Sequence, residues 1–254
     1  NTKEEFRATI TDELREVSKD SHLSLMLVKD ENAKLTHVRT ELVEERKNNF
    51  AFQKLEVLPR NVGYMKINKF YSDERARLVV DHAFGYLESS DAMIIDLRDC
   101  VGGSPELVRY VVSHFFHDEK KLWSIHGRGD ESITDYLSIK GLGSEHLKSG
   151  YPLIILIGPQ TASAAELFSY TLKNFKKAII IGENSKGAAH LVGAQRINQY
   201  FNGRFSIARP VNPVTNDSWE GVGVTPNIFV SSGNSGLVAA LDAAHKALDA
   251  PMSK

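Results

Sequence analysis

The chain has 254 residues, of which 42% are hydrophobic, and its formal net charge is -1. That length is enough for one sizeable core, and the balanced charge argues against a nucleic-acid partner and against disorder. The single cysteine, Cys100, excludes an intramolecular disulfide and a cysteine-based zinc site. No apolar run approaches the roughly 20 residues that a membrane helix needs, so we expect no membrane span. We also expect no metal and no cofactor.

An amphipathic helix is predicted over residues 2–18. Thr2 and Glu5 have the spacing of a capping box, in which each side chain binds a backbone N–H at the helix start. The apolar residues of the segment fall on one face, which carries Phe6, Ile10, Leu14 and Val17.

The following residues are less regular. A short strand is predicted from Leu23 to Val28, and residues 29–49 form a charged connector with some helix. Two strands around a turn follow, over residues 55–59 and 62–70. A helix then begins after Ser72 and ends near Ser89.

Three buried strands indicate the fold class. Continuous apolar runs, typical of strands buried on both faces, lie near residues 92–97, 152–157 and 178–182. Ser104 and Pro105 have the pattern of an N-cap and first helical residue, and that helix runs to about Phe116. Another helix follows Thr161. This alternation of strands and helices predicts an α/β fold.

The C-terminal part has a different pattern. After Gly187 the chain becomes β-like, with a hairpin turn expected at Gly203, and an Ala-rich helix is expected over residues 236–249. We divide the chain into an N-terminal helical region and connector, residues 1–50, which we expect to be an incomplete unit, and an α/β core, residues 51–254.

A serine lies just after the second buried strand, in the segment Thr161-Ala-Ser163-Ala-Ala-Glu166. The start of a helix offers unpaired N–H groups and a positive dipole end, and both suit the stabilisation of an oxyanion. Ser163 is therefore a candidate nucleophile. The alternative is that Ser163 or Thr161 acts only as an N-cap.

Two glycines follow the first buried strand. Gly102 and Gly103 permit positive φ and a close backbone approach, so an N–H of this loop could form an oxyanion hole with the N–H of Ala164. We assign the loop donor to Gly103. A plain turn between a strand and a helix would have the same local sequence.

Three residues are candidate general bases. His22 lies between small polar residues in Asp20-Ser21-His22, whereas Lys186 and His190 belong to the segment 182–190. Glu220, in a glycine-containing loop, is a candidate for the carboxylate that orients the base. Each of these residues could instead be an ordinary surface or strand residue.

Four segments together resemble the tail-specific (C-terminal processing) protease superfamily, over nearly the whole chain. They are GYMKINKF at 63–70, IDLRDCVGG at 95–103, TASAAE at 161–166 and GVTP at 223–226, with Asn227 in place of the usual Asp. The resemblance implies a crotonase-like core of ββα units arranged in a spiral. It also implies a hydrolase that acts on a peptide or protein substrate and an exported, periplasmic or extracellular, location.

Details of the motifs point to one branch of the superfamily. The bacterial enzymes use a serine–lysine dyad, but the position of that lysine is Ala188 here, and Lys186 lies two residues earlier and is expected to point elsewhere. The segment from Gly187 to His190 is similar to the GGAH form found in the branch of interphotoreceptor retinoid-binding protein. The interval between His22 and Gly63 is too short for the PDZ domain of many relatives.

Tricorn protease, another relative, suggests roles for these residues. By that resemblance Ser163 is the nucleophile and His22 the base, with Ser21 and Glu220 as supporting hydrogen-bond partners. His190 and then Lys186 are the alternative bases. The function implied is a serine peptidase that forms an acyl-enzyme. A non-catalytic binder of an apolar ligand such as a retinoid or fatty acid is the alternative, and an esterase is a third.

Overall fold

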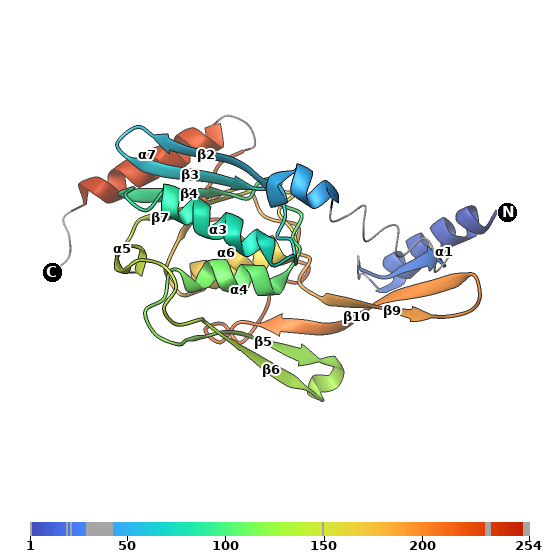
Figure 1. The fold of residues 1–254 in the computed structure, drawn as a ribbon. Helices are drawn as coiled ribbons and strands as arrows, with labels where there is room; N and C mark the ends of the chain where they lie inside the picture. The colour runs from blue at the N-terminus through green and yellow to red at the C-terminus, as the bar shows by residue number, and fades with distance from the viewer. Residues whose placement is uncertain are drawn as a thin grey trace.

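A computed structural model describes residues 2–18, 20, 22–28, 43–148, 150–231 and 235–250. It is a mixed α/β fold with two sheets (Figure 1). The larger sheet has the order β11-β8-β7-β4-β3-β2, and its neighbours are parallel except for the antiparallel pair β2–β3. Its strands are β2 (Phe52–Leu58), β3 (Val62–Ile67), β4 (Ala92–Asp96), β7 (Leu153–Ile157), β8 (Ile179–Gly182) and β11 (Ile228–Phe229). This confirms the α/β prediction; the spiral arrangement stays a prediction.

The larger sheet is covered by helices on both faces, so its central strands are buried. Every residue of β4 and of β7 is buried, as their continuous apolar runs predicted. On one face, Ala240 and Ala244 of helix α7 (Ser235–Asp249) pack against Ile94 and Ile154. The other face packs against three helices, α3 (Arg75–Tyr86), α4 (Pro105–Ser113) and α6 (Ala164–Asn174) (Figure 1).

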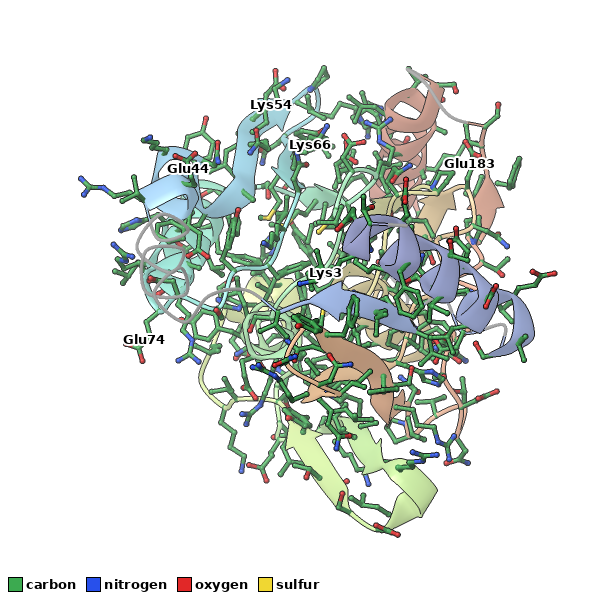
Figure 2. All side chains as sticks on the ribbon, turned by 90° about the vertical axis from the view of Figure 1, so that its right-hand side faces the viewer. Lys3, Glu44, Lys54, Lys66, Glu74 and Glu183 are labelled. Atoms are coloured by element: carbon green, nitrogen blue, oxygen red, sulfur yellow. The ribbon has the colours of Figure 1, made fainter. Side chains whose placement is uncertain are left out.

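The smaller sheet is antiparallel and is organised around one long strand. β10 (Phe201–Val211) pairs with β1, β5 and β9, and β5 pairs with β6. The other strands are β1 (Ser24–Leu27), β5 (Lys121–Gly127), β6 (Ile133–Leu137) and β9 (Leu191–Arg196). Helix α1 (Lys3–Ser18) lies beside β1, and both face the viewer in Figure 2. The remaining short elements are α5 (Glu145–Lys148), the 3-10 turns Asn49–Ala51 and Arg128–Asp130, and a helical stretch at 43–47, which agrees with the helix expected in the connector.

The predicted start of the N-terminal helix is confirmed, but the face predicted to be buried is not the buried face. The Thr2 N–H donates to Glu5 Oε2 at 2.8 Å and the Glu5 N–H donates to Thr2 Oγ1 at 3.1 Å, which is the expected capping box. Val17, however, is 87% exposed. The buried side is set by the contact with β1, where Thr11 Oγ1 accepts a hydrogen bond from the Leu25 N–H.

Two other predictions need correction. Gly203 is not at the turn of the hairpin: it lies inside β10, paired with Gln195 and Leu25, and the turn is formed by the residues between β9 and β10. Strands β5 and β6 occur where the sequence predicts no element. Polar residues interrupt the buried and half-buried run of β5, and the first three residues of β6 are exposed, so neither strand has a continuous apolar run. In the part of the chain that the structure describes, no helix is long and apolar enough to cross a bilayer.

Candidate active site

Ser163 lies in a tight turn between β7 and α6 and is exposed. Its backbone has φ 54° and ψ -120°, a conformation that a residue with a side chain rarely adopts. Such strain costs about 1–3 kcal/mol and persists only where the surrounding structure enforces it. The turn therefore holds the hydroxyl at the start of α6, where the dipole of the helix is positive.

Glu166 is the group that enforces this turn. Its side chain is fully buried, and it accepts hydrogen bonds from the Ser163 N–H at 2.8 Å and from the N–H groups of Gly187 at 2.6 Å and Ala188 at 2.9 Å. The Ser185 hydroxyl also donates to it, at 2.6 Å. One carboxylate thus joins the serine turn to the loop that follows β8.

The glycine loop after β4 lies against the same turn. A Cβ atom on Gly102, whose φ is 102°, would be 2.7 Å from Ser163 Cβ, so only glycine fits. Gly103 has φ 131° and pairs with Phe70, and a side chain there would collide with the Phe70 carbonyl. Gly103 and Ala164 both line the cleft that contains Ser163. Ala164 opens α6, so its N–H has no acceptor within the helix.

His22 reaches this region because β1 pairs with β10. In this antiparallel pair Ser24 lies opposite Arg204. The same register, extended by two residues beyond the strand, places His22 near Ser206. His22 is 9% exposed and its Nδ1 lies 3.0 Å from Asp20 Oδ1. An ionised carboxylate only accepts hydrogen bonds, so Nδ1 carries the proton and Nε2 is left as the free base.

Asp20 is itself held in place. The Ser206 hydroxyl donates to its Oδ2 at 2.6 Å, and the His22 N–H donates to its Oδ1 at 2.8 Å. Burial acts to raise the pKa of Asp20, but the hydrogen bonds from Ser206 and His22 outweigh burial and lower the pKa below its usual value. Asp20 is therefore a charged acceptor at neutral pH.

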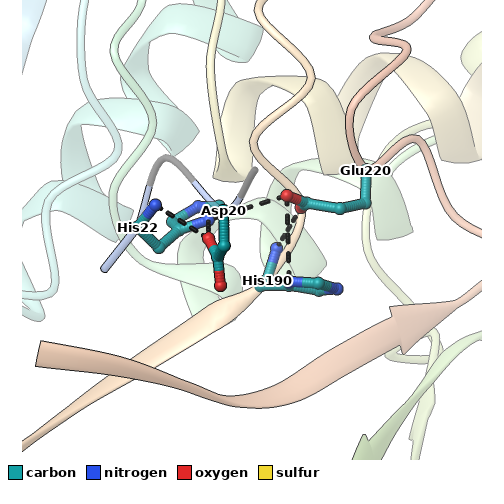
Figure 3. Close-up of side chains that lie close together, drawn as sticks. All are labelled: Asp20, His22, His190 and Glu220. Atoms are coloured by element: carbon teal, nitrogen blue, oxygen red, sulfur yellow. Dashed lines mark hydrogen bonds and ion pairs between the residues drawn. The ribbon is translucent and has the colours of Figure 1, made fainter. Parts of the chain in front are cut away.

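Glu220 and His190 complete the group (Figure 3). Glu220 Oε1 lies 3.7 Å from the Nδ1 atoms of both His22 and His190, and its Oε2 accepts hydrogen bonds from the N–H groups of Ala189 and His190. The ring centroids of the two histidines are 5.9 Å apart. Glu220 thus stands between two imidazoles.

A cleft of about 670 Å³ joins these groups. Ser163, His22 and His190 line it, together with Gly103 and Ala164. Lys186 and Ala188 line it as well, so the expectation that Lys186 points elsewhere is wrong, although Lys186 is exposed. Ala188, at the position of the family's lysine, offers no base.

The structure adds two functional residues that were not assigned from the sequence, Asp20 and Glu166. It does not describe Ser21, a predicted member of the site. Asp20, not only Glu220, faces His22, and Glu166 organises the serine turn. The pair Asp20–His22 could have been suspected from their spacing, but the contact of Asp20 with Ser206 could not. Ser21 lies outside the described residues, so its supporting role stays a prediction.

Comparison with known proteins agrees with the sequence motifs. Residues 61–230 match Peptidase family S41. The chain is 30% identical over 170 residues to carboxyl-terminal-processing peptidase 2, chloroplastic, of Arabidopsis thaliana, a match that covers 65% of this chain and 31% of that protein. The chain thus spans about a third of the length of this curated relative.

Two solved structures share the fold over nearly the whole chain. One is a putative peptidase from Parabacteroides merdae, with a TM-score of 0.65, 19% identity and coverage of 98% of this chain and 84% of that one. The other is a lipoprotein from Streptococcus agalactiae, with a TM-score of 0.66, 14% identity and coverage of 97% and 83%. At these identities the similarity concerns the fold alone.

Proposed function

Because the chain belongs to peptidase family S41, we propose that it is a serine peptidase with Ser163 as its nucleophile and His22 as its general base. One observation carries the proposal: a strained, exposed serine at a helix start shares a cleft with a histidine whose Nδ1 is paired to a carboxylate. Family membership supports a peptidase and gives no support to a binder of apolar ligands.

The proposed reaction is acyl transfer. His22 Nε2 takes the proton of Ser163 Oγ as that oxygen attacks the carbonyl carbon of the scissile peptide bond. The N–H groups of Gly103 and Ala164 receive the oxyanion, and one such donor contributes about 2.7–4 kcal/mol to transition-state binding. His22 then gives the proton to the leaving amine. A water molecule, activated in the same way, hydrolyses the acyl-enzyme.

Supporting roles follow from the contacts. Asp20 keeps the proton of His22 on Nδ1, and Glu220 lies close enough to stabilise the imidazolium that forms during attack. Ser21 remains part of the proposed network by resemblance. His190 is the second candidate for the base and Lys186 the third.

We also propose finer assignments that rest on motifs. The replacement of the family's lysine by Ala188, together with His190, favours the branch of interphotoreceptor retinoid-binding protein with a tricorn-like catalytic set. The short interval between His22 and Gly63 favours recognition of substrate without a PDZ domain there. An exported location is proposed on the same resemblance.

The direct test is the Ser163→Ala variant. Hydrolysis of casein-derived peptides should be lost, while the fold stays intact because the exchange leaves almost no cavity. A fluorophosphonate probe should label the parent protein at Ser163, as mapped by mass spectrometry, and should not label the variant. Ser235→Ala, which changes an exposed serine on α7, is the matched control and should keep full activity.

Two outcomes would contradict the proposal. Peptide hydrolysis that persists in Ser163→Ala, or a label on another residue, would remove Ser163 from the mechanism. Hydrolysis of short acyl esters without any hydrolysis of peptides would identify an esterase instead.

A further inference from the structure

The cluster of Asp20, His22, His190 and Glu220 has the dimensions of a metal site. One potential ligand atom from each residue lies within 4.8 Å of those from the other three. The individual separations include 3.0 Å from His22 Nδ1 to Asp20 Oδ1 and 3.7 Å from Glu220 Oε1 to each Nδ1. Zinc binds nitrogen and oxygen at about 2.0–2.2 Å, and a tetrahedron of that size separates its ligand atoms by about 3.3–3.6 Å.

His190 supplies a second, independent observation. Its Nδ1 atom is buried and has no hydrogen-bond partner among the described residues, while it faces Glu220 Oε1 at 3.7 Å. A buried polar atom without a partner costs free energy, and a bound ion is one way in which proteins remove that cost. The orphaned nitrogen points to a ligand at the centre of the cluster.

The surroundings already hold the carboxylates in position. The N–H groups of Ala189 and His190 bind Glu220 Oε2, which leaves Oε1 toward the two imidazoles. The Ser206 hydroxyl binds Asp20 Oδ2 and leaves Oδ1 toward His22. Hydrogen bonds to the carboxylate oxygens that would not contact the metal orient the ligands and strengthen metal binding.

The donor set also selects the class of metal. Two neutral imidazoles and two carboxylates balance a charge of +2, and no lysine or arginine in the described parts of the chain forms an ion pair with either carboxylate. Imidazole nitrogen suits zinc and its transition-metal neighbours, whereas calcium and magnesium prefer oxygen ligands throughout.

We propose that Asp20, His22, His190 and Glu220 bind a zinc ion, and that the ion switches the peptidase off. The regulatory half rests on the proposed role of His22. Zinc takes the lone pair of His22 Nδ1, so the single proton of the neutral imidazole moves to Nε2. Nε2 then has no lone pair to accept the Ser163 proton, and attack stops. A chelator restores the free base.

Binding is measured without reference to activity. Ser163→Ala, titrated with ZnCl₂ in a calorimeter, should bind one zinc ion per chain, and Co²⁺ in its place should give the visible absorption of a tetrahedral site. In the same background, Ser206→Ala should weaken binding by about 10–100-fold, as expected when a support of a ligand is lost. His190→Ala should abolish it.

Controls separate loss of a ligand from loss of fold. His245→Ala removes a histidine on α7 outside the cluster, where its ring contacts the Pro59 carbonyl, and should leave zinc binding unchanged. Glu220→Gln is a second ligand variant of nearly the same size. Each variant should unfold cooperatively on heating without metal, which shows that lost binding is not lost structure.

The outcomes distinguish the two proposals. Absence of saturable binding by Ser163→Ala, or binding that survives in both His190→Ala and Glu220→Gln, would overturn the zinc site. Full hydrolysis by the zinc-loaded parent protein would overturn the switch. Binding of one zinc ion by a protein that hydrolyses no peptide even with EDTA would keep the site and reject the peptidase.

Discussion

Two histidines, His22 and His190, lie on either side of the Glu220 carboxylate, so the assignment of the general base depends on the other contacts of each ring. Glu220 Oε1 is equally distant, at 3.7 Å, from both Nδ1 atoms, but only His22 has a second carboxylate partner, Asp20 at 3.0 Å. That partner fixes the tautomer and makes Nε2 of His22 the available base. The lysine alternative is weaker, because Lys186 is exposed, whereas a lysine that serves as a general base is typically buried.

Substitution of each histidine distinguishes them. In the presence of EDTA, His22→Ala should lower kcat/KM by about 10²–10⁴-fold, the usual contribution of a general base. His190→Ala should lower kcat/KM much less, since the hydrogen bond of Asp20 is made with the His22 ring and not with His190. Asp20→Asn should lower kcat more than it changes KM, because it disturbs the tautomer and not substrate binding. A larger loss in His190→Ala than in His22→Ala would reverse the assignment.

At the scale of elements, the start of α6 depends on a loop from elsewhere in the chain. The conformation of Ser163 is unfavourable by itself, and Glu166 compensates by binding four donors, of which three are N–H groups and one is the Ser185 hydroxyl. A fully buried carboxylate is stable only with such a set of partners. The helix start and the loop after β8 are thus one structural unit.

Glu166→Gln should destabilise the protein by about 2–4 kcal/mol, because an amide nitrogen would face backbone N–H donors and leave them unsatisfied. Urea unfolding followed by circular dichroism measures this change. Glu106→Gln, on an exposed side chain of α4, is the matched control and should change stability by less than about 0.5 kcal/mol. Equal stability of the two variants would show that Glu166 does not hold the turn.

At the scale of the whole molecule, a buried carboxylate at the end of β4 links two neighbouring strands of the larger sheet, because it accepts a hydrogen bond from Tyr64 of β3. Asp96, at the end of β4, is fully buried and accepts hydrogen bonds from the Arg98 guanidinium at 2.9 and 2.6 Å and from the Tyr64 hydroxyl at 2.7 Å. Burial acts to raise the pKa of Asp96, but these bonds outweigh it and the pKa is lowered.

This gives a prediction for the dependence of stability on pH. A carboxyl group whose folded pKa lies below its unfolded value of 3.8 stabilises the native state fully above that value and loses this contribution as the pH falls through the folded pKa. The difference in the free energy of unfolding between the parent protein and the Asp96→Asn variant should therefore be constant near neutral pH and become smaller below about pH 4. Urea unfolding across this range measures it, and a difference that grows toward acid pH would contradict the assignment.

Much of the architecture follows from local sequence. The apolar runs of β4 and β7 predict buried strands, Ser104 and Pro105 predict the start of α4, and Thr2 with Glu5 predicts the cap of α1, because each depends on residues close in the chain. The motif around Ser163 likewise predicts the start of α6, which directly follows that serine, and makes Ser163 the candidate nucleophile. Strands β5 and β6 were not predicted, because neither has a continuous apolar run and each is recognised only by its pairing with a neighbouring strand.

The chemistry around the nucleophile was decided by tertiary structure. The sequence by itself determined the α/β class, the buried strands and the candidate residues Ser163, His22 and Glu220. Only the pairing of β1 with β10 carries His22 and Asp20 to Ser206, and only the contact between the loops at Gly187 and Gly221 brings His190 to Glu220. The physical reason is that hydrogen bonds between distant segments depend on register and side-chain direction, which no local pattern encodes.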